Sequence, residues 1–401
     1  MEVEADNVAI IRNLLSKDDY KLNRAYVNVD ASPMSPGFGS LYVSDYAGAS
    51  KASNGVYVYD ALYNRLNDTP INTPAFNTNA TLGISSNGNV FVTDAVADRA
   101  GLWTMPCGDT QSGFTQFFEG ENASGIITSG GAEVAGITTS VAFRGTGADE
   151  KMYAFVKTSS GKYAINIYNI GGANGLAATT WGVAPSKVLT LPFTAESDAT
   201  IVPVEQGVWL CQTISSQSNT ENKPTLLFID YDGNITFNQG MLANKPLLSG
   251  AGGSAMCVSR DESTLVVNDE NGLFQFFDVT FSGTTPTLTP RYSYEHGIGV
   301  ASRRLLDGKY IEQMAFDYAG NLVASGHYLG VFTIPTDDNR CLVPAADIIV
   351  KTSDIRGVEA DDADENAPVE YFNLQGVKVE KPENGIFIKR QGKKVEKVII
   401  Q

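Results

Sequence analysis

The sequence predicts an all-β protein of the β-propeller class, and three observations carry that prediction. The 401 residues include 39 glycines, 17 tyrosines and 19 phenylalanines, with many short runs of Val, Ile and Thr, which is typical of strands joined by tight turns. One strand-turn-strand pattern recurs six times along the chain. Its copies begin roughly 50 to 60 residues apart, a little more than the usual length of a four-stranded propeller blade.

The clearest copy of the repeat runs from Phe316 to Pro335. Gly320-Asn321 opens a hairpin, Leu322 to Ser325 forms one short strand run, and Val331 to Ile334 forms the next. The other five copies have their paired runs at residues 39–45 with 55–60, 88–94 with 101–105, 151–156 with 163–168, 207–211 with 226–230, and 264–269 with 272–278.

Further apolar runs flank these pairs, so we expect four strands in each unit. Runs at residues 82–84, 140–143, 255–258 and 313–316 precede a pair, and runs at 114–118 and 287–289 follow one. Such a unit cannot bury both faces alone, whereas radial stacking of several units covers them. A pair of β-sandwiches is the alternative, and a repeat above about 50 residues is too long for a solenoid coil.

We predict six blades, with seven as the alternative. The N-terminal run from Asn7 to Ile11 and the run from Ile348 to Val350 either belong to an extra blade or close the ring by pairing the first blade with the last.

The turns of the repeat carry a resemblance to a known superfamily. Asn87-Gly88-Asn89, Asp232-Gly233-Asn234 and Ala319-Gly320-Asn321, followed by strands such as VFVTD, resemble the six-bladed NHL and lactonase-type propellers over residues 24–345. Asn-Gly and Asp-Gly supply the positive φ angles that tight hairpins need. The resemblance implies a metal near the propeller axis, held by carboxylates and Asn, that assists hydrolysis.

The composition divides the chain into a propeller at residues 1–352, an acidic linker at 353–370 and a C-terminal β segment at 371–401. The linker has seven acidic residues and one basic residue, and no apolar periodicity. The last segment has seven Lys or Arg against three Glu, with strand runs at 371–374, 385–388 and 395–400.

This C-terminal segment resembles the sorting-type tails of proteins secreted by Bacteroidetes. The matching residues are Tyr371 to Gly376 for the opening "Y-N-L-x-G", Gly385 to Ile388 for "G-I-Y-I", and a Lys-rich last hairpin. Phe372 is inserted into the opening, and Phe387 replaces a common Tyr. The resemblance implies export, to the medium or the cell surface. A small β-subdomain with no sorting role is the alternative.

Charge and hydropathy exclude some partners. The net charge of −16 repels the phosphates of nucleic acids and anionic lipid headgroups. No run of about 18 apolar residues occurs, so we expect a soluble mature chain without a membrane span. The start is acidic where a signal peptide would be basic. Cys107, Cys211, Cys257 and Cys341 show no CxxC pairing, so we predict buried free thiols, with a disulfide between repeats as the alternative.

Few catalytic constellations are available to this sequence. Its two histidines, His296 and His327, exclude a three-His metal site and an HExxH protease, and neither a GxSxG elbow nor a P-loop occurs. Asp45, Asp94 and Asp269 each end the first strand of a predicted hairpin. On a propeller they would converge on one face, where three carboxylates could hold Ca²⁺. Capping of their own turns is the other interpretation of these aspartates.

A candidate ligand site lies in the long loop from Tyr292 to Tyr310, which precedes the inner strand of the last repeat. Aromatic rings beside arginines suit sugar rings or acidic groups. The predicted ligand-binding residues are Tyr294, His296, Arg303, Arg304, His327 and Tyr328. Pairing of the two arginines with nearby carboxylates is the alternative.

These observations predict a secreted or cell-surface, monomeric, non-catalytic protein that binds a glycan or a protein. A Ca²⁺-assisted hydrolase or lyase is the alternative function, and a structural or assembly component is a third.

Overall fold

The computed structural model describes most of the repeat and part of the C-terminal segment. The described residues are 10–13, 25–33, 35–45, 55–71, 81–96, 99–111, 113–119, 127–129, 132–135, 137–157, 163–171, 185–192, 199–212, 224–240, 255–268, 273–295, 311–325, 329–332, 368–372, 378–379, 381–382, 385–391 and 394–400. The chain forms two compact units, Met1–Ile349 and Val350–Gln401. Within the described residues, regular structure is β-strand except for a 3-10 turn at Gly147–Asp149.

Among the described residues of the first unit, six antiparallel sheets of three or four strands follow one another, and we number them as blades 1 to 6 in chain order. Blade 1 consists of β2 (Ala25–Val29), β3 (Leu41–Asp45) and β4 (Gly55–Tyr59). Blade 2 consists of β5 (Leu82–Ser85), β6 (Asn89–Val96), β7 (Arg99–Pro106) and β8 (Thr115–Glu119). Blade 3 consists of β11 (Ile137–Arg144), β12 (Lys151–Lys157), β13 (Tyr163–Asn169) and β14 (Lys187–Thr190). A two-stranded sheet of β9 (Ile127–Ser129) and β10 (Ala132–Ala135) lies between blades 2 and 3 in sequence.

Blades 4 and 5 are each built from four consecutive strands, whereas blade 6 takes its outermost strand from the N-terminus. Blade 4 consists of β15 (Ala199–Val204), β16 (Gly207–Gln212), β17 (Pro224–Asp230) and β18 (Ile235–Gly240). Blade 5 consists of β19 (Met256–Val258), β20 (Thr264–Asn268), β21 (Leu273–Ser282) and β22 (Thr285–Glu295). Blade 6 consists of β23 (Gln313–Phe316), β24 (Leu322–Ser325), β25 (Leu329–Phe332) and β1 (Ile10–Asn13).

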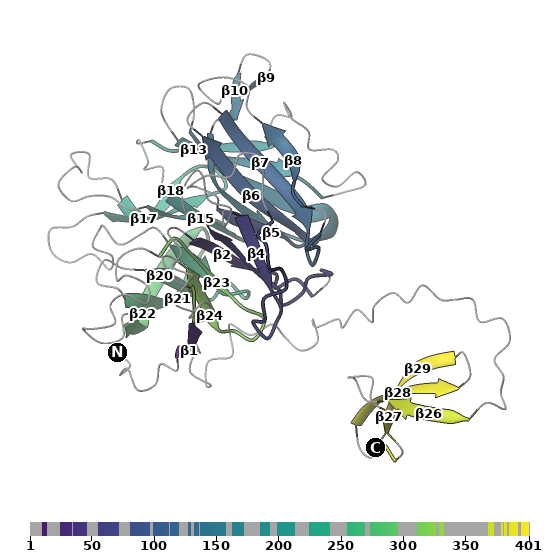
Figure 1. Ribbon diagram of the computed structural model, residues 1–401. Coiled ribbons are helices and arrows are strands. Elements are labelled where there is room, and N and C mark those ends of the chain that lie inside the picture. Colours follow the sequence, from purple (N-terminus) through teal and green to yellow (C-terminus); the bar gives the residue numbers. More distant parts are fainter. Residues whose placement is uncertain are drawn as a thin grey trace. The chain divides into compact units, whose positions relative to one another are not determined.

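The innermost strands of these blades contact one another in a closed cycle, β2, β5, β11, β15, β19, β23 and back to β2. Figure 1 shows four of them, β2, β5, β15 and β23, grouped in the middle of the first unit. One cluster of buried apolar side chains fills each of the six interfaces between neighbouring blades. Each blade therefore buries both of its faces against its neighbours, which a lone sheet of this kind cannot do. The chain is a β-propeller, as predicted. The choice between six and seven blades for the whole chain stays a prediction.

Strand periodicity explains how one strand serves two interfaces, because successive side chains point to opposite faces of a sheet. On β3, Leu41 and Val43 pack toward blade 6, whereas Tyr42 packs toward blade 2. Trp209 on β16 is fully buried in the cluster between blades 4 and 5. Apolar residues on both faces thus identify second strands as buried rather than half-exposed.

The structure confirms the predicted paired runs as strands and adjusts some of their ends. The last repeat has β24 at Leu322–Ser325 as predicted, but its partner β25 begins at Leu329 rather than at Val331. Strand β6 continues to Val96, so Asp94 does not end it. Its partner β7 begins two residues before the predicted Gly101, and Asp94 pairs with Gly101 within this longer hairpin.

Ring closure uses the N-terminal run. Strand β1 pairs antiparallel with β25, with Ile10 opposite Phe332 and Asn13 opposite Gly330. The chain that precedes blade 1 thereby supplies the outer strand of blade 6, which for the N-terminal run agrees with closure by pairing, one of the two alternatives considered. Residues 348–350, the other run considered for closure, lie outside the described residues.

The predicted free thiols are also confirmed where they are described. Cys107, Cys211 and Cys257 are buried and form no disulfide, and each packs in a cluster between blades. Cys341 lies outside the described residues.

The second unit is a single antiparallel sheet in the order β27, β26, β28, β29. Its strands are β26 (Val369–Phe372), β27 (Lys378–Val379), β28 (Gly385–Gln391) and β29 (Lys394–Ile400). Strand β26 begins two residues before the segment boundary expected at residue 371. Across β26 and β27, Lys378 Nζ lies 2.7 Å from Glu370 Oε1.

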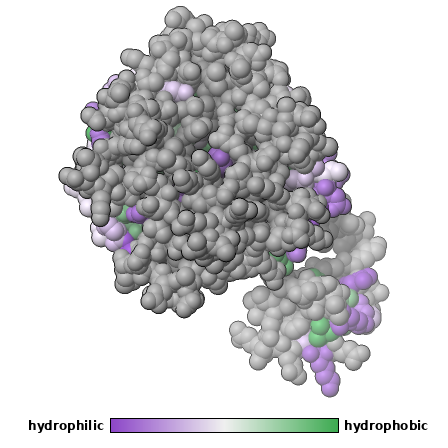
Figure 2. Space-filling view, turned by 60° about the vertical axis from the view of Figure 1, so that its left-hand side comes forward, coloured by the Kyte–Doolittle hydropathy of each residue, from purple (hydrophilic) through white to green (hydrophobic). Residues whose placement is uncertain are grey.

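The described surface in Figure 2 is mainly hydrophilic, with small hydrophobic spots between the polar residues. No helix in the described part of the chain is long and apolar enough to cross a membrane.

Candidate functional site

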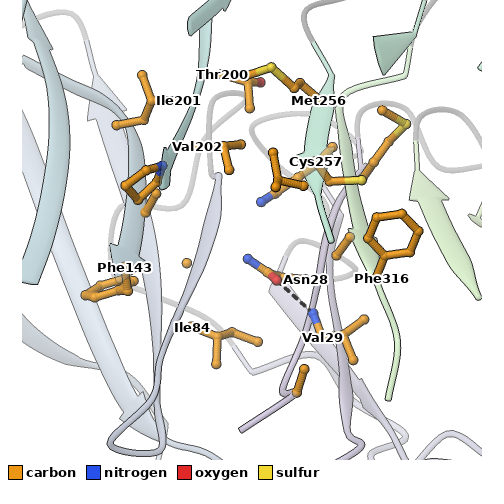
Figure 3. Close-up of a pocket in the computed structure, with 18 of the residues that line it drawn as sticks. Asn28, Val29, Ile84, Phe143, Thr200, Ile201, Val202, Met256, Cys257 and Phe316 are labelled. Atoms are coloured by element: carbon orange, nitrogen blue, oxygen red, sulfur yellow. Dashed lines mark hydrogen bonds between the residues drawn. The ribbon is translucent and has the colours of Figure 1, made fainter. Parts of the chain in front are cut away.

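The inner strands enclose a channel cavity of about 350 Å³ on the propeller axis. Its walls come from all six inner strands, which Figure 3 shows as side chains converging on one space. Val29, Ile84, Val202, Val258 and Phe316 are among the apolar residues that line it. The lining of the cavity therefore contains both apolar and polar residues.

The side-chain amides of Asn28 and Gln313 form hydrogen bonds with backbone groups on the free edge of inner strand β5. Gln313 Nε2 and Asn28 Nδ2 both donate to the carbonyl of Leu82, at 2.6 and 3.0 Å. The amide of Leu82 donates back to Gln313 Oε1. Because an inner strand has no further strand beside it, its edge would otherwise leave backbone groups unpaired inside the propeller. Asn28 and Gln313 are thus primarily structural residues of the channel.

At one end the cavity widens into a channel mouth of about 490 Å³. This is the turn end of the blades, where each inner strand turns into the second strand. Residues of blades 1, 2, 3 and 5 line the mouth, and the charged ones are Arg144, Glu150 and Arg260. Arg144 and Arg260 also line the deeper cavity, as does Glu262.

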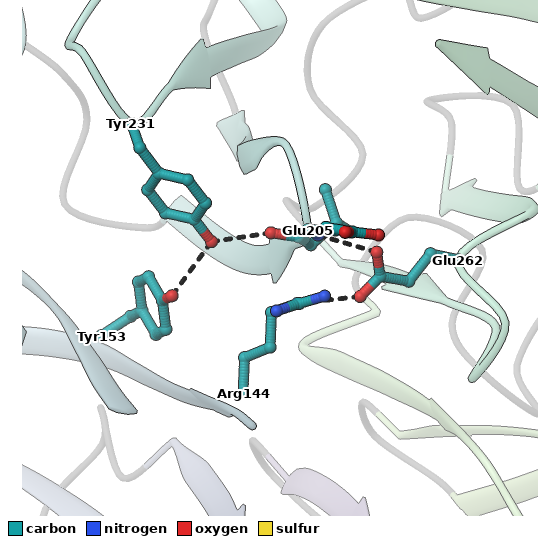
Figure 4. Close-up of polar contacts among 6 residues, drawn as sticks. Arg144, Tyr153, Glu205, Tyr231 and Glu262 are labelled. Atoms are coloured by element: carbon teal, nitrogen blue, oxygen red, sulfur yellow. Dashed lines mark hydrogen bonds and ion pairs between the residues drawn. The ribbon is translucent and has the colours of Figure 1, made fainter. Parts of the chain in front are cut away.

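An ion pair crosses the channel between blades 3 and 5. Arg144 Nε donates to Glu262 Oε1 at 2.9 Å, and the other oxygen of Glu262 accepts from the amide of Glu205 in blade 4 at 2.7 Å (Figure 4). Burial lowers the pKa of Arg144, but the hydrogen bond and charge of Glu262 outweigh it and raise the pKa above its usual value. Arg144 is therefore a fixed, permanent cation.

Glu262 reaches Arg144 from a strained backbone conformation. Its φ angle is +60°, in the left-handed region that L residues other than Gly, Asn and Asp rarely adopt. A strained non-glycine residue persists only where its surroundings hold it, and such residues concentrate at functional sites. Here the strained turn carries the side chain that orients Arg144.

Two tyrosines extend the network beside Arg144 (Figure 4). Tyr231 donates to the carbonyl of Val204 at 2.6 Å, so the 2.9 Å contact between the phenolic oxygens is a bond donated by Tyr153. Burial raises the pKa of both phenols above the usual value. Both therefore stay protonated and act as hydrogen-bond donors and not as bases.

Glu150 ties blade 3 to blade 2 at the mouth. Its buried carboxylate accepts from Ser85 Oγ at 2.9 Å and from Ser86 Oγ at 2.8 Å, and also from the amide of Ser86 and from Asn87 Nδ2. Four donors thus occupy the two oxygens of this carboxylate. It is a poor candidate for a general base, since its lone pairs are already occupied.

Most of the predicted ligand residues lie outside the described part of the chain. This holds for His296, Arg303, Arg304, His327 and Tyr328, whereas Tyr294 is described in its backbone on β22, where it pairs with Phe274. The binding roles assigned to these residues stay predictions.

The predicted metal ligands are placed only in part. Asp45 ends β3 opposite Gly55, and Asp94 pairs with Gly101, so both lie toward the end of their blades opposite the turn end. Asp269 lies outside the described residues. Among described residues, no three His, Cys, Asp or Glu side chains gather as metal ligands would. The Ca²⁺ site stays a prediction.

Sequence reasoning did not find the residues of the channel mouth. Arg144 ends the inner strand β11, and Glu150 and Glu262 stand in turns that follow inner strands, where a charged residue is ordinarily solvated. The signal that could have found them is position: Arg144 is the last residue of an inner strand, and Glu205 and Asp317 each follow an inner strand directly, in three repeats. Equivalent positions become neighbours once the repeats close into a ring.

Among the comparisons with known proteins, only the one with solved structures found similar proteins, and the similarity is one of fold. No family model matches the chain. No curated protein matches it either. Among solved structures it is similar to U3-55K, at 10% identity and a TM-score of 0.44 over 82% of this chain and 99% of that one. It is also similar to the Cps50 (Swd1) β-propeller domain of Myceliophteria thermophila, at 11% identity and a TM-score of 0.42 over 76% and 80% of the chains. A third is the extracellular domain of BT4673 from B. thetaiotaomicron, at 13% identity and a TM-score of 0.36 over 73% and 31%.

Proposed function

We propose that this protein is an exported binding protein without catalytic activity, and that it takes a glycan or a protein partner on its propeller. The observation that carries the proposal is the channel mouth. There, turns from several blades fix charged side chains around a cavity of about 490 Å³, within the usual range of ligand sites of roughly 300 to 1,000 Å³. A rigid scaffold that presents fixed polar groups around a cavity is suited to recognition.

The state of the carboxylates in the mouth and in the deeper cavity supports binding over catalysis. The carboxylates of Glu150, Glu262 and Asp317 each accept two or more hydrogen bonds from neighbouring blades or from their own turn. General acid or base work needs a group whose proton can be exchanged with substrate. These groups are instead committed to holding the blades together.

Screening of the purified full chain on a glycan array, with a parallel pull-down, tests this proposal. We expect a saturable ligand that the Arg144→Ala variant binds at least tenfold more weakly, and no turnover of lactones or esters. Turnover without a ligand in either screen would overturn it. Size-exclusion chromatography with light scattering tests the expected monomer.

Export rests on the resemblance of residues 371–401 to sorting-type tails, and it has its own test. Expression of the chain with and without those residues in a Bacteroidetes host, followed by fractionation, should place only the full chain outside the cell. Equal distribution of both forms would overturn export through this tail and leave the binding proposal intact.

The alternative function is a Ca²⁺-assisted hydrolase or lyase. Asp45 and Asp94 belong to consecutive blades and lie toward the same end of them, which is compatible with a shared ion. A bound ion would raise the melting temperature by mass action. Elemental analysis that finds Ca²⁺, and a Ca²⁺-dependent melting shift that the Asp45→Asn and Asp94→Asn variants lose, would favour this function over the first.

A further inference from the structure

The guanidinium of Arg144 has donors to spare at the channel mouth. Its one hydrogen bond to the described residues is made by Nε, to Glu262. The side chain is 34% exposed and lines both the mouth and the deeper cavity. The two terminal amino groups, with four N–H bonds, are therefore available to a ligand.

This cation is also preorganised. Glu262 fixes it from blade 5 and is itself fixed by the amide of Glu205. An arginine that is already held in place loses little side-chain freedom when a ligand binds, so more of the interaction appears as affinity. Its two amino groups also match the two oxygens of a carboxylate.

The other charged residues of the mouth and the deeper cavity differ in how strongly they compete with a ligand for the guanidinium of Arg144. Glu150 is buried under four donors, and Asp317 is held by the amides of Ala319 and Asn321. Arg260 adds a second positive charge to the lining. Glu262 is the carboxylate that forms an ion pair with Arg144 and would compete with an anionic ligand for it. The electrostatic balance at this guanidinium is therefore set mainly by one neighbour.

The wall beside Arg144 is apolar. Val29, Ile84 and Phe143 line both the mouth and the deeper cavity. Phe143 is held by a tilted contact with Phe91, with ring centroids 4.6 Å apart. Thr146, which is exposed at the rim, adds a hydroxyl with no hydrogen bond to the described residues. The mouth thus pairs a forked cation with an apolar surface.

We propose that the channel mouth binds a small organic carboxylate, with its anionic head on the terminal amino groups of Arg144 and its apolar body against Ile84 and Phe143. This inference rests on the proposed binding function and names the chemical class that the mouth takes. Neither an inorganic anion nor an uncharged apolar compound uses both parts of the site.

Isothermal titration and ligand-detected NMR with the full chain test the inference. The probes are phenylacetate, its uncharged analogue 2-phenylethanol, the cation 2-phenylethylamine and inorganic phosphate. We expect phenylacetate to bind at least tenfold more tightly than the other three. Equal binding of phosphate would show an unspecific anion site, and equal binding of phenylethanol would show that Arg144 takes no part. Either result overturns the inference.

Two variants have opposite expected effects. Arg144→Met removes the fork and should weaken phenylacetate binding by about tenfold or more. Glu262→Gln removes the competing charge while keeping an acceptor, and should strengthen binding by about three- to tenfold. Arg291→Met, on the outer strand β22 near Asp278, is the matched control and should bind as the unaltered chain does. Weaker binding by a folded Glu262→Gln variant would contradict the proposal.

The fold of each variant is checked by its melting temperature. If Arg144→Met does not fold, Arg144→Lys keeps the charge without the fork, and undiminished binding by it would equally overturn the inference. Phenylacetate binding without any glycan or protein partner would overturn the proposed function alone. A partner that binds while phenylacetate does not would overturn the present inference alone.

Discussion

The phenolic oxygen of Tyr63 donates a hydrogen bond to Oδ2 of Asp317, a residue 254 positions further along the chain. The bond joins the turn after β4 in blade 1 to the turn after β23 in blade 6. Close by, the rings of Phe38 and Tyr318 make an edge contact with centroids 5.9 Å apart. Together with the pairing of β1 on β25, these contacts close the ring between its first and last blades.

Removing the Tyr63 hydroxyl should loosen this seam. Tyr63→Phe leaves the ring of the side chain in place but deprives Asp317 of one donor, and we expect the free energy of unfolding to fall by about 1 to 3 kcal/mol. Urea unfolding measures the change. The control is Tyr318→Phe, because the Tyr318 hydroxyl has no hydrogen-bond partner among the described residues. Equal stability of the two variants would show that the bond does not hold the seam.

Removing β1 tests closure by pairing. Deletion of residues 1–13 removes the pairs that Ile10, Arg12 and Asn13 make with β25, and it leaves that strand as a bare edge. We expect a loss of about 1 to 3 kcal/mol in the free energy of unfolding, since each ladder bond contributes about 0.5 to 1.5 kcal/mol. Concentration-dependent association through the exposed edge should accompany it. Deletion of residues 1–9 keeps β1 and is the control; equal behaviour of the two truncations contradicts the prediction.

Local patterns explain why the strands were predictable. Short apolar runs and turn chemistry act within a few residues, and the glycines of the three turns named from sequence, Gly88, Gly233 and Gly320, do have positive φ angles. The turns of Asp230 and Asp317 also share one hydrogen-bond pattern, in which the carboxylate accepts from the amide and the side chain of the Asn four residues later.

The site was not predictable by the same means, because its contacts are not local. Arg144 in blade 3 and Glu262 in blade 5 are 118 residues apart and meet only when blades 3 to 5 stack around the axis. Tyr63 illustrates a signal that was present: Asp60 and Asn64 repeat the spacing and hydrogen bonds of the other two turns. Tyr63, with a φ angle of +64°, stands where they have glycine. A bulky residue at a glycine position indicates that its side chain has a role.

Neutralising Glu150 should separate blades 2 and 3. In the Glu150→Gln variant, one oxygen becomes an NH₂ group that faces the donors of Ser85, Ser86 and Asn87. At least one buried donor loses its acceptor, so we expect a loss of about 2 to 4 kcal/mol in the free energy of unfolding. Denaturant titration measures it, with Asp149→Asn, an exposed neighbour, as the control. A loss no larger than that of the control would mean that the clamp contributes little.

Acid should weaken the turns built on Asp60 and Asp230. Burial raises the pKa of each carboxyl, but the hydrogen bonds from Asn64 and Asn234 outweigh it and hold the pKa below its usual value. A carboxyl with a lowered folded-state pKa stabilises the fold fully above its unfolded pKa of about 4, and that contribution is lost as pH falls through the folded pKa. The Asp60→Asn and Asp230→Asn variants should therefore lose less stability than the unaltered chain between pH 5 and 2, measured by thermal melts. Parallel pH curves would contradict this assignment.

The thiols of Cys107, Cys211 and Cys257 should be unreactive while the propeller is folded. All three are buried between blades, and burial raises the pKa of Cys211 to about 12. At pH 8 the reactive thiolate of such a group is about one part in 10⁴. In a Cys341→Ser background, we expect Ellman's reagent to modify these thiols only at the rate of unfolding, and all three at once in urea. Rapid modification of the folded protein would show that a blade interface opens without global unfolding, and labelling site by site would identify which one.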